Sequence, residues 1–134
     1  MKSLLPIRLF YVVASAYDGL LGLAFLVFAA RIYSHFGITP PNHWGYIHFP
    51  AGVLMIFGLM FLMIALHPIE NRNLITYGIL LKLCYAGTVG WHWYYGGIPT
   101  MWKYFAFADL VFAVLFFWSM VRLEAAATEA AATK

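Results

Sequence analysis

The chain alternates between long apolar runs and short polar stretches. Four runs are long enough for a helix to cross a bilayer, which takes about 20 apolar residues. They cover approximately residues 7–30, 49–66, 74–95 and 101–121. Backbone polar groups inside a bilayer need hydrogen-bond partners within the segment, so apolar runs of this length predict helices rather than strands. The pattern therefore predicts an all-α integral membrane protein.

The stretches between the runs are short and rich in residues that turn the chain. The longest, residues 31–47, contains two glycines and two prolines, and we expect an ordered loop or a short re-entrant cap there. Residues 67–73 and 96–100 are tighter turns. Short turns make consecutive helices antiparallel neighbours. Residues 1–123 are therefore expected to form one antiparallel four-helix transmembrane bundle.

Two residues suggest where particular helices begin. Pro50 suits the first turn of the second helix, because its missing N–H has no intrahelical partner there anyway. Thr100 is expected to be the N-cap of the fourth helix, since a threonine hydroxyl accepts a hydrogen bond from the first turn.

The composition changes after residue 123. Residues 124–134 form an alanine-rich tail with two copies of EAAAT. Such a segment favours helix but has no face of bulky apolar side chains. Two interpretations stay open, a cytoplasmic extension of the fourth helix and an appended tail without a functional role.

The distribution of lysine and arginine predicts the orientation in the membrane. Four spans place both termini on one side, together with the turn at residues 67–73. That side collects Lys2, Arg8, Arg72, Arg122 and Lys134, whereas the other side has Arg31 and Lys103. Because cytoplasmic loops carry the excess of positive residues, we expect both termini in the cytoplasm.

The composition agrees with a membrane protein and excludes several other classes. Hydrophobic residues make up 64% of the 134 residues and charged residues only 10%, against about one half and one quarter in soluble domains. The single cysteine, Cys84, rules out an internal disulfide and a CxxC redox motif. There is no basic stripe with interleaved aromatic residues, so no nucleic-acid partner is expected.

Three charged residues lie deep inside the predicted spans, far from the span ends, namely Asp18, Lys82 and Asp109. A charge at membrane depth is costly and needs a partner. At about 1.5 Å per helical residue, the lysine lies at a depth from which it reaches either carboxylate if the helices are neighbours. Tyr85 lies on the same helix face as Lys82. These four residues are the candidate polar core or ligand-binding site.

This polar core has two interpretations. A buried ion pair that fixes helix register is the structural one, and removing one partner of such a pair typically costs about 3–5 kcal/mol. The functional one is a site for a ligand head group or a proton step. Two acids with one base leave a formal charge of −1, so either one carboxyl is protonated or a cationic group completes the site.

Histidines and tryptophans gather near the opposite membrane surface. His48 and His92 are expected at similar depths on the second and third helices, and two facing imidazoles are able to ligate a b-type haem. With His43 or His35 they would instead offer a zinc or copper site. The chain has no HExxH, HxxxH or ExxH spacing to support these sites. The tryptophans are those of an ordinary interfacial belt.

Motifs of the common enzyme classes are missing from the sequence. It contains no GxSxG, P-loop, kinase or dinucleotide fingerprint. The leading hypothesis is a non-catalytic membrane protein that binds a lipophilic small molecule, a lipid or a quinone, or serves as an accessory subunit of a larger membrane complex. The alternatives are a redox-linked subunit that uses His48 and His92 with haem, metal or quinone, and a small transporter that works as an oligomer. Expected partners are membrane lipids and other membrane chains or further copies of this one.

The arrangement resembles the small four-helix bacterial membrane proteins called DoxX-like. The resemblance rests on the pair Asp18-Gly19, the turn HPIENRN at residues 67–73, the spacing from Gly78 to Lys82, and Asp109 within FADLVFAVLFF. It implies a compact bundle in the bacterial cytoplasmic membrane. Some relatives are described as subunits of quinone-linked oxidoreductases, but many have no assigned role, so the cofactor stays unknown, with haem, quinone and metal all possible. The resemblance supplies no catalytic residues.

Overall fold

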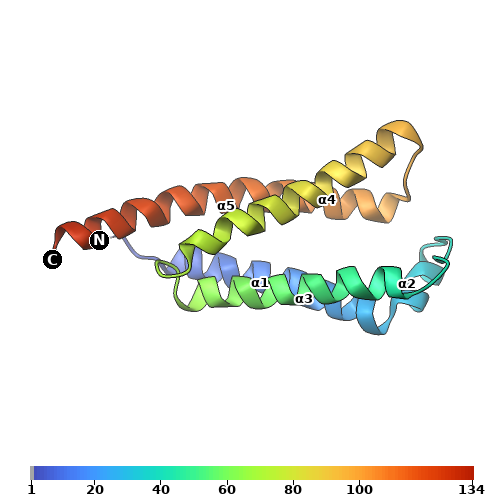
Figure 1. Cartoon of the computed structure of the whole chain (residues 1–134), viewed down its shortest axis with the longest axis horizontal. Helices are drawn as coiled ribbons and strands as arrows, with labels where there is room; N and C mark the ends of the chain where they lie inside the picture. Colours follow the sequence, from blue (N-terminus) through green and yellow to red (C-terminus); the bar gives the residue numbers. More distant parts are fainter. Residues whose placement is uncertain (1) are drawn as a thin grey trace.

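A computed structural model describes residues 2–134 of the chain (Figure 1). The helices are α1 (Leu5–Val27), α2 (Ala29–His35), α3 (Gly45–Leu66), the 3-10 turn η1 (Arg72–Leu74), α4 (Ile75–Tyr95) and α5 (Thr100–Ala132). Within the described residues, α1, α3, α4 (with η1) and α5 are long and apolar enough to cross a membrane. The predicted four-helix architecture is confirmed, and the chain is a multi-pass membrane protein. Both ends of the chain lie at the same end of the bundle in Figure 1.

The four long helices form two pairs. Helix α1 packs along α3, and α4 packs along α5, as Figure 1 shows. Helices α3 and α4 meet only weakly despite the short turn between them, and α4 leans away from α3 toward its C-terminal end. The expectation that a short turn makes these two helices close neighbours was therefore wrong.

Small residues set the close approach of α1 and α3. A Cβ atom on Gly22 would lie 2.5 Å from the carbonyl oxygen of Ala51, and one on Gly58 would lie 2.9 Å from the Cα of Gly19. The Ser15 hydroxyl donates a hydrogen bond of 2.7 Å to the Gly58 carbonyl. Lipid provides no hydrophobic drive between helices, so close backbone packing of this kind holds membrane helices together.

Aromatic side chains fill the space between the two pairs. The rings of Tyr11 and Phe116 are stacked with centroids 5.4 Å apart, and Phe61 lies 4.9 Å from Phe116. Gly78 leaves room for this layer, because a Cβ there would lie 2.7 Å from the Phe61 ring. Aromatic pairs at these distances are stabilising beyond the area that they bury. Large aromatic side chains therefore pack between the two pairs, whereas glycines allow the close contact between α1 and α3 within one pair.

The first predicted span ends earlier than expected. Helix α1 stops at Val27, and Phe28 has φ −118° and ψ 17° before α2 begins. The break turns α2 so that Tyr33 is buried, with its ring 5.3 Å from Trp44 and 6.0 Å from Trp102. Residues 31–47, expected to be a loop or cap, thus contain most of a short helix. Its end is a Schellman motif around Gly37 (φ +64°), in which Ile38 N–H donates to the Tyr33 carbonyl.

Two predicted helix starts were wrong. Helix α3 begins at Gly45, four residues before the predicted boundary, so Pro50 lies inside the helix and not in its first turn. Pro50 has no N–H to offer the Tyr46 carbonyl one turn earlier. In α5, Thr100 is the first helical residue, and its side chain makes no capping hydrogen bond. The extended Pro99, with ψ 141°, occupies the cap position instead.

Side chains satisfy backbone groups at the terminal end of the bundle. The Arg8 guanidinium donates 2.9 Å to the Ala65 carbonyl, and the Asn71 amide donates 2.9 Å to the Met63 carbonyl. Both acceptors lie in the last turn of α3; the Met63 carbonyl also accepts from the His67 N–H at 3.0 Å, whereas the Ala65 carbonyl has no partner within the helix. At the same end α5 continues without a break through the alanine-rich residues to Ala132. Helical extension, one of the two interpretations of residues 124–134, agrees with this structure.

Candidate ligand-binding site

The three intramembrane charges meet between the two helix pairs. Lys82 of α4 places its Nζ atom 2.6 Å from Asp18 Oδ1 of α1 and 2.9 Å from Asp109 Oδ1 of α5. The side chains of Lys82 and Asp18 are 1% exposed, and that of Asp109 is 8% exposed. The ion triad therefore links both pairs in a region shielded from solvent, where charge-assisted hydrogen bonds are strong.

Aromatic rings complete the surroundings of the lysine. The Lys82 Nζ atom lies 5.2 Å from the ring centroid of Tyr17 and 5.2 Å from that of Phe112. Cations within about 6 Å of a ring centroid are attracted to the π face. Two carboxylates and two aromatic rings thus surround the ammonium group.

Two buried polar atoms in the triad's neighbourhood lack a partner. Among the described residues, the Tyr17 hydroxyl and the second carboxylate oxygen of Asp18, Oδ2, make no hydrogen bond. Buried polar atoms are hydrogen-bonded in the large majority of cases. An unpaired carboxylate oxygen costs free energy unless a ligand or another group supplies a donor.

A cavity of about 450 Å³ lies beside these atoms. All four long helices contribute to its wall, which is lined by Tyr17, Asp18, Leu21, Phe25, Ile47, Phe49, Pro50, Ala51, Val53, Leu54, Leu81, Tyr85, Trp102, Phe105 and Asp109. Its volume is in the range of small-molecule sites, which combine mostly apolar walls with a few polar groups. Here the wall is almost entirely apolar, and the polar residues among its lining are Tyr17, Asp18, Tyr85 and Asp109.

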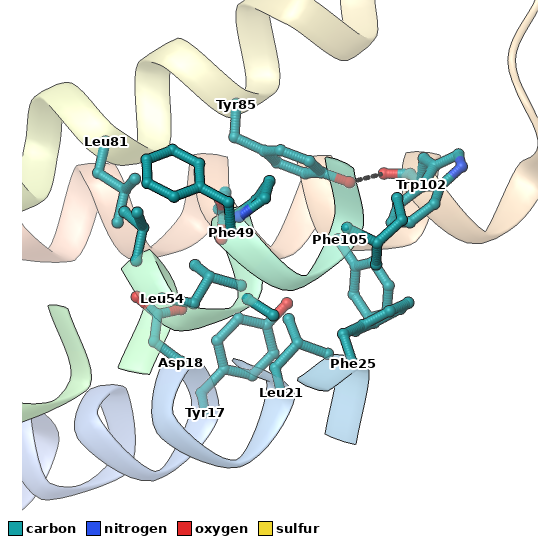
Figure 2. A pocket seen from close by; sticks show the side chains of 15 residues that line it. Tyr17, Asp18, Leu21, Phe25, Phe49, Leu54, Leu81, Tyr85, Trp102 and Phe105 are labelled. Carbon is teal, nitrogen blue, oxygen red and sulfur yellow. Dashed lines mark hydrogen bonds between the residues drawn. The ribbon is translucent and has the colours of Figure 1, made fainter. Parts of the chain in front are cut away.

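Figure 2 shows how the side chains surround the cavity. Tyr85 projects from α4 across the upper side, and its hydroxyl donates a hydrogen bond of 3.0 Å to the Trp102 carbonyl of α5. Phe25 and Phe105 form the wall on the right of the view, while Asp18 lies on its left. The Phe25 ring stacks on Trp102 with centroids 5.6 Å apart. The cavity thus has an aromatic end and an acidic end.

The sequence identified four residues of this site and missed others. Asp18, Lys82 and Asp109 come together as predicted, and Tyr85 lines the cavity beside them. Tyr17 and Phe112, which contact the ammonium group, were not singled out. Phe112 lies three residues after Asp109, so helical periodicity around the acid would have indicated it. Tyr17 is adjacent to Asp18 in sequence, which gives no such signal.

The histidines lie away from the triad. His48 is half-buried in α3, and His92 is exposed in the last turn of α4, at ends of the helices that diverge in Figure 1. His43 accepts a hydrogen bond of 2.9 Å from the Gly45 N–H through Nδ1. Among residues 2–134, no three histidine, cysteine or acidic side chains form a group able to hold a metal ion. A haem held by His48 and His92 stays a prediction.

Comparison of the chain with protein-family models, curated proteins and solved structures found no match. The resemblance to DoxX-like proteins therefore stays a prediction from the sequence motifs. The functional argument rests on the site itself.

Proposed function

We propose that this membrane protein binds a lipophilic small molecule in the cavity between its helix pairs. The observation that supports this most directly is the cavity of about 450 Å³, whose lining residues include Asp18 with its unpaired Oδ2 atom. An apolar body would contact Phe25, Leu54 and Phe105, while a polar head group would meet the carboxylates. A lipid and a quinone both have this division into an apolar and a polar part.

The ligand would enter from the bilayer. Phe49 and Pro50 line the cavity and belong to the exposed surface of α3. Helix α4 leans away from α3 on this side of the bundle (Figure 1). A molecule dissolved in lipid would therefore reach the cavity without crossing the charged triad. The proposed setting is the cytoplasmic membrane, with both termini in the cytoplasm.

Native purification with a cavity-filling variant tests this function. Wild-type protein, extracted in a mild nonionic detergent, should retain a lipophilic compound that mass spectrometry of an organic extract identifies. Val53→Phe places a larger side chain in the cavity wall and should abolish retention. Val111→Phe is the matched control, because Val111 is 61% exposed on the outer surface of α5. Equal retention by wild type and both variants would place the compound in the annular lipid and contradict the proposal.

An accessory role in a larger membrane complex is the second candidate. It is favoured by the outer end of α4, where Trp91, Tyr94 and Tyr95 are 63%, 83% and 66% exposed on a helix that leans out of the bundle. Aromatic residues are enriched at protein interfaces. Replacing these three residues by serine should release any partner chains that co-purify with the wild type. Purification of the wild-type protein without other chains would argue against this role.

A further inference from the structure

The acidic end of the cavity presents carboxylates and not the lysine. Asp18 and Asp109 are among its lining residues, whereas Lys82 is not. The ammonium group of Lys82 is held between the Oδ1 atoms of the two aspartates and the rings of Tyr17 and Phe112. A molecule in the cavity therefore lies beside the two aspartates and not beside the lysine, within a wall that is otherwise almost entirely apolar.

The charges of the triad do not balance. Two carboxylates and one ammonium group leave one uncompensated negative charge in a region that is almost fully buried. An unpaired charge is expensive in such surroundings. Either protonation of one carboxyl group or a ligand that carries one positive charge restores neutrality, whereas an anionic ligand adds repulsion.

The hydrogen-bonding groups also favour a donor. Asp18 Oδ2 has no partner and, as a carboxylate oxygen, only accepts. The Tyr85 hydroxyl already gives its hydrogen to the Trp102 carbonyl, so toward the cavity it offers lone pairs. The unpaired Tyr17 hydroxyl accepts as well as donates. A protonated amine has donors and no acceptors, which matches these groups.

Aromatic walls are compatible with the same ligand. Phe25, Phe105 and Trp102 line the rest of the cavity. They provide an apolar surface for a hydrocarbon body, and aromatic faces tolerate a nearby cation better than aliphatic side chains do. The cavity thus combines a large apolar body site with a small polar end where Asp18 and Asp109 are among the lining residues.

We infer that the cavity selects a cationic amphiphile, with a protonated primary amine directed at Asp18 and Asp109 and an apolar body among the aromatic residues. This inference rests on the proposed binding function and specifies its ligand class. It distinguishes an amine from the neutral head group of a quinone and from the carboxylate of a fatty acid.

A series of probes with one chain length tests the inference on the wild-type protein. Binding of dodecylamine, dodecyltrimethylammonium, dodecanol and dodecanoate is measured by native mass spectrometry from a nonionic detergent. Dodecylamine should bind at least about tenfold more tightly than dodecanol, because close charge pairs contribute at least this much at interfaces. Dodecyltrimethylammonium, which cannot donate to Asp18 Oδ2, should be intermediate, and dodecanoate should be weakest.

The outcomes separate this inference from the proposed function. Equal binding of dodecanol and dodecylamine, with loss of both in Val53→Phe, would retain a lipophile-binding cavity and overturn the cationic head group. Binding of none of the probes, or equal binding by wild type and Val53→Phe, would remove both proposals. Amine-selective binding that Val53→Phe abolishes and Val111→Phe preserves would establish the inferred ligand class.

Asp109→Asn provides a second test. The asparagine keeps an oxygen for Lys82 and removes the excess negative charge, so the variant should bind dodecylamine no better than dodecanol. Unchanged amine selectivity in a folded variant would overturn the assigned role of the carboxylates. If the variant does not fold, the wild-type series decides. Phosphatidylethanolamine in nanodiscs then distinguishes two sources of the natural amine. If this lipid competes with dodecylamine for the protein, the natural ligand is a lipid amine; if it does not compete, the natural ligand is a free amine.

Discussion

The hydroxyl groups of Tyr11 and Ser119 lie 2.7 Å apart in the buried core, although 108 residues separate them in the sequence. Ser119 donates its own hydrogen to the Phe116 carbonyl at 2.8 Å. The Tyr11 hydroxyl is therefore the donor in the contact between α1 and α5. This is a direct polar link between the two helix pairs at a level different from the ion triad.

This link predicts an unequal effect of removing either partner. Ser119→Ala leaves the Tyr11 hydroxyl buried without an acceptor and should lower the free energy of unfolding by about 1–3 kcal/mol. Tyr11→Phe removes the donor and should cost less, about 0.5–1.5 kcal/mol. The measurement is the midpoint of unfolding in mixed detergent micelles. The double variant should be more stable than Ser119→Ala alone, and a less stable double variant would contradict this reading.

Lys82→Met should destabilise the protein strongly. It leaves two buried carboxylates facing each other without their cation, and removal of one partner from a buried ion pair typically costs about 3–5 kcal/mol. The same unfolding assay measures this loss. Lys103→Met is the control, because Lys103 lies near the membrane surface over the Trp93 ring, 4.3 Å from its centroid. If both variants match the wild type, Lys82 reaches the interface instead and the triad is not structural.

Two glycines of α3 should respond in opposite ways to the same substitution. A Cβ on Gly58 would lie 2.9 Å from the backbone of Gly19, whereas a Cβ on Gly52 meets nothing within 4 Å. Gly58→Ala should therefore destabilise by about 1–3 kcal/mol through overpacking. Gly52→Ala should be neutral or stabilising by up to about 1 kcal/mol, because alanine is the better helix former. Equal stability of the two variants would show that α1 and α3 are less closely packed than described.

The orientation is testable by labelling engineered cysteines in intact cells. The native Cys84 is replaced by alanine, and single cysteines are introduced at the exposed positions Asn42 and Asn73. An impermeant thiol reagent should label Asn42→Cys from outside and reach Asn73→Cys only after the membrane is opened. This follows from the excess of lysine and arginine on the side of the termini. The reverse pattern would invert the predicted topology.

The sequence predicted the spans and the triad for one physical reason. Apolar length determines which segments cross a bilayer, and a charge inside it needs an opposite charge as partner. The sequence alone therefore predicts that Asp18, Lys82 and Asp109 are partners. Their second consequence, an unpaired oxygen beside a cavity, required atomic positions, because it depends on which carboxylate oxygen the lysine reaches.

Other features depend on contacts that local sequence does not encode. The break at Phe28 has no proline or glycine signal, and it accompanies the burial of Tyr33 against Trp44 and Trp102. Helices α3 and α4 make little contact although only a short turn joins them. The early start of α3 was missed because proline is common in the first turn of helices, whereas in α3 Pro50 lies one turn further along.

The separation into two helix pairs has a consequence for biosynthesis. Asp18 belongs to the pair that leaves the ribosome first, whereas Lys82 and Asp109 both belong to the second. The second pair can thus enter the bilayer with an ion pair of its own, in which Lys82 Nζ lies 2.9 Å from Asp109 Oδ1. The first must hold an unmatched carboxyl group until α4 arrives, at a cost of about 2.5–3.5 kcal/mol on insertion scales. Completion of the nascent chain therefore gives the Asp18 carboxyl group a cation, which it shares with Asp109.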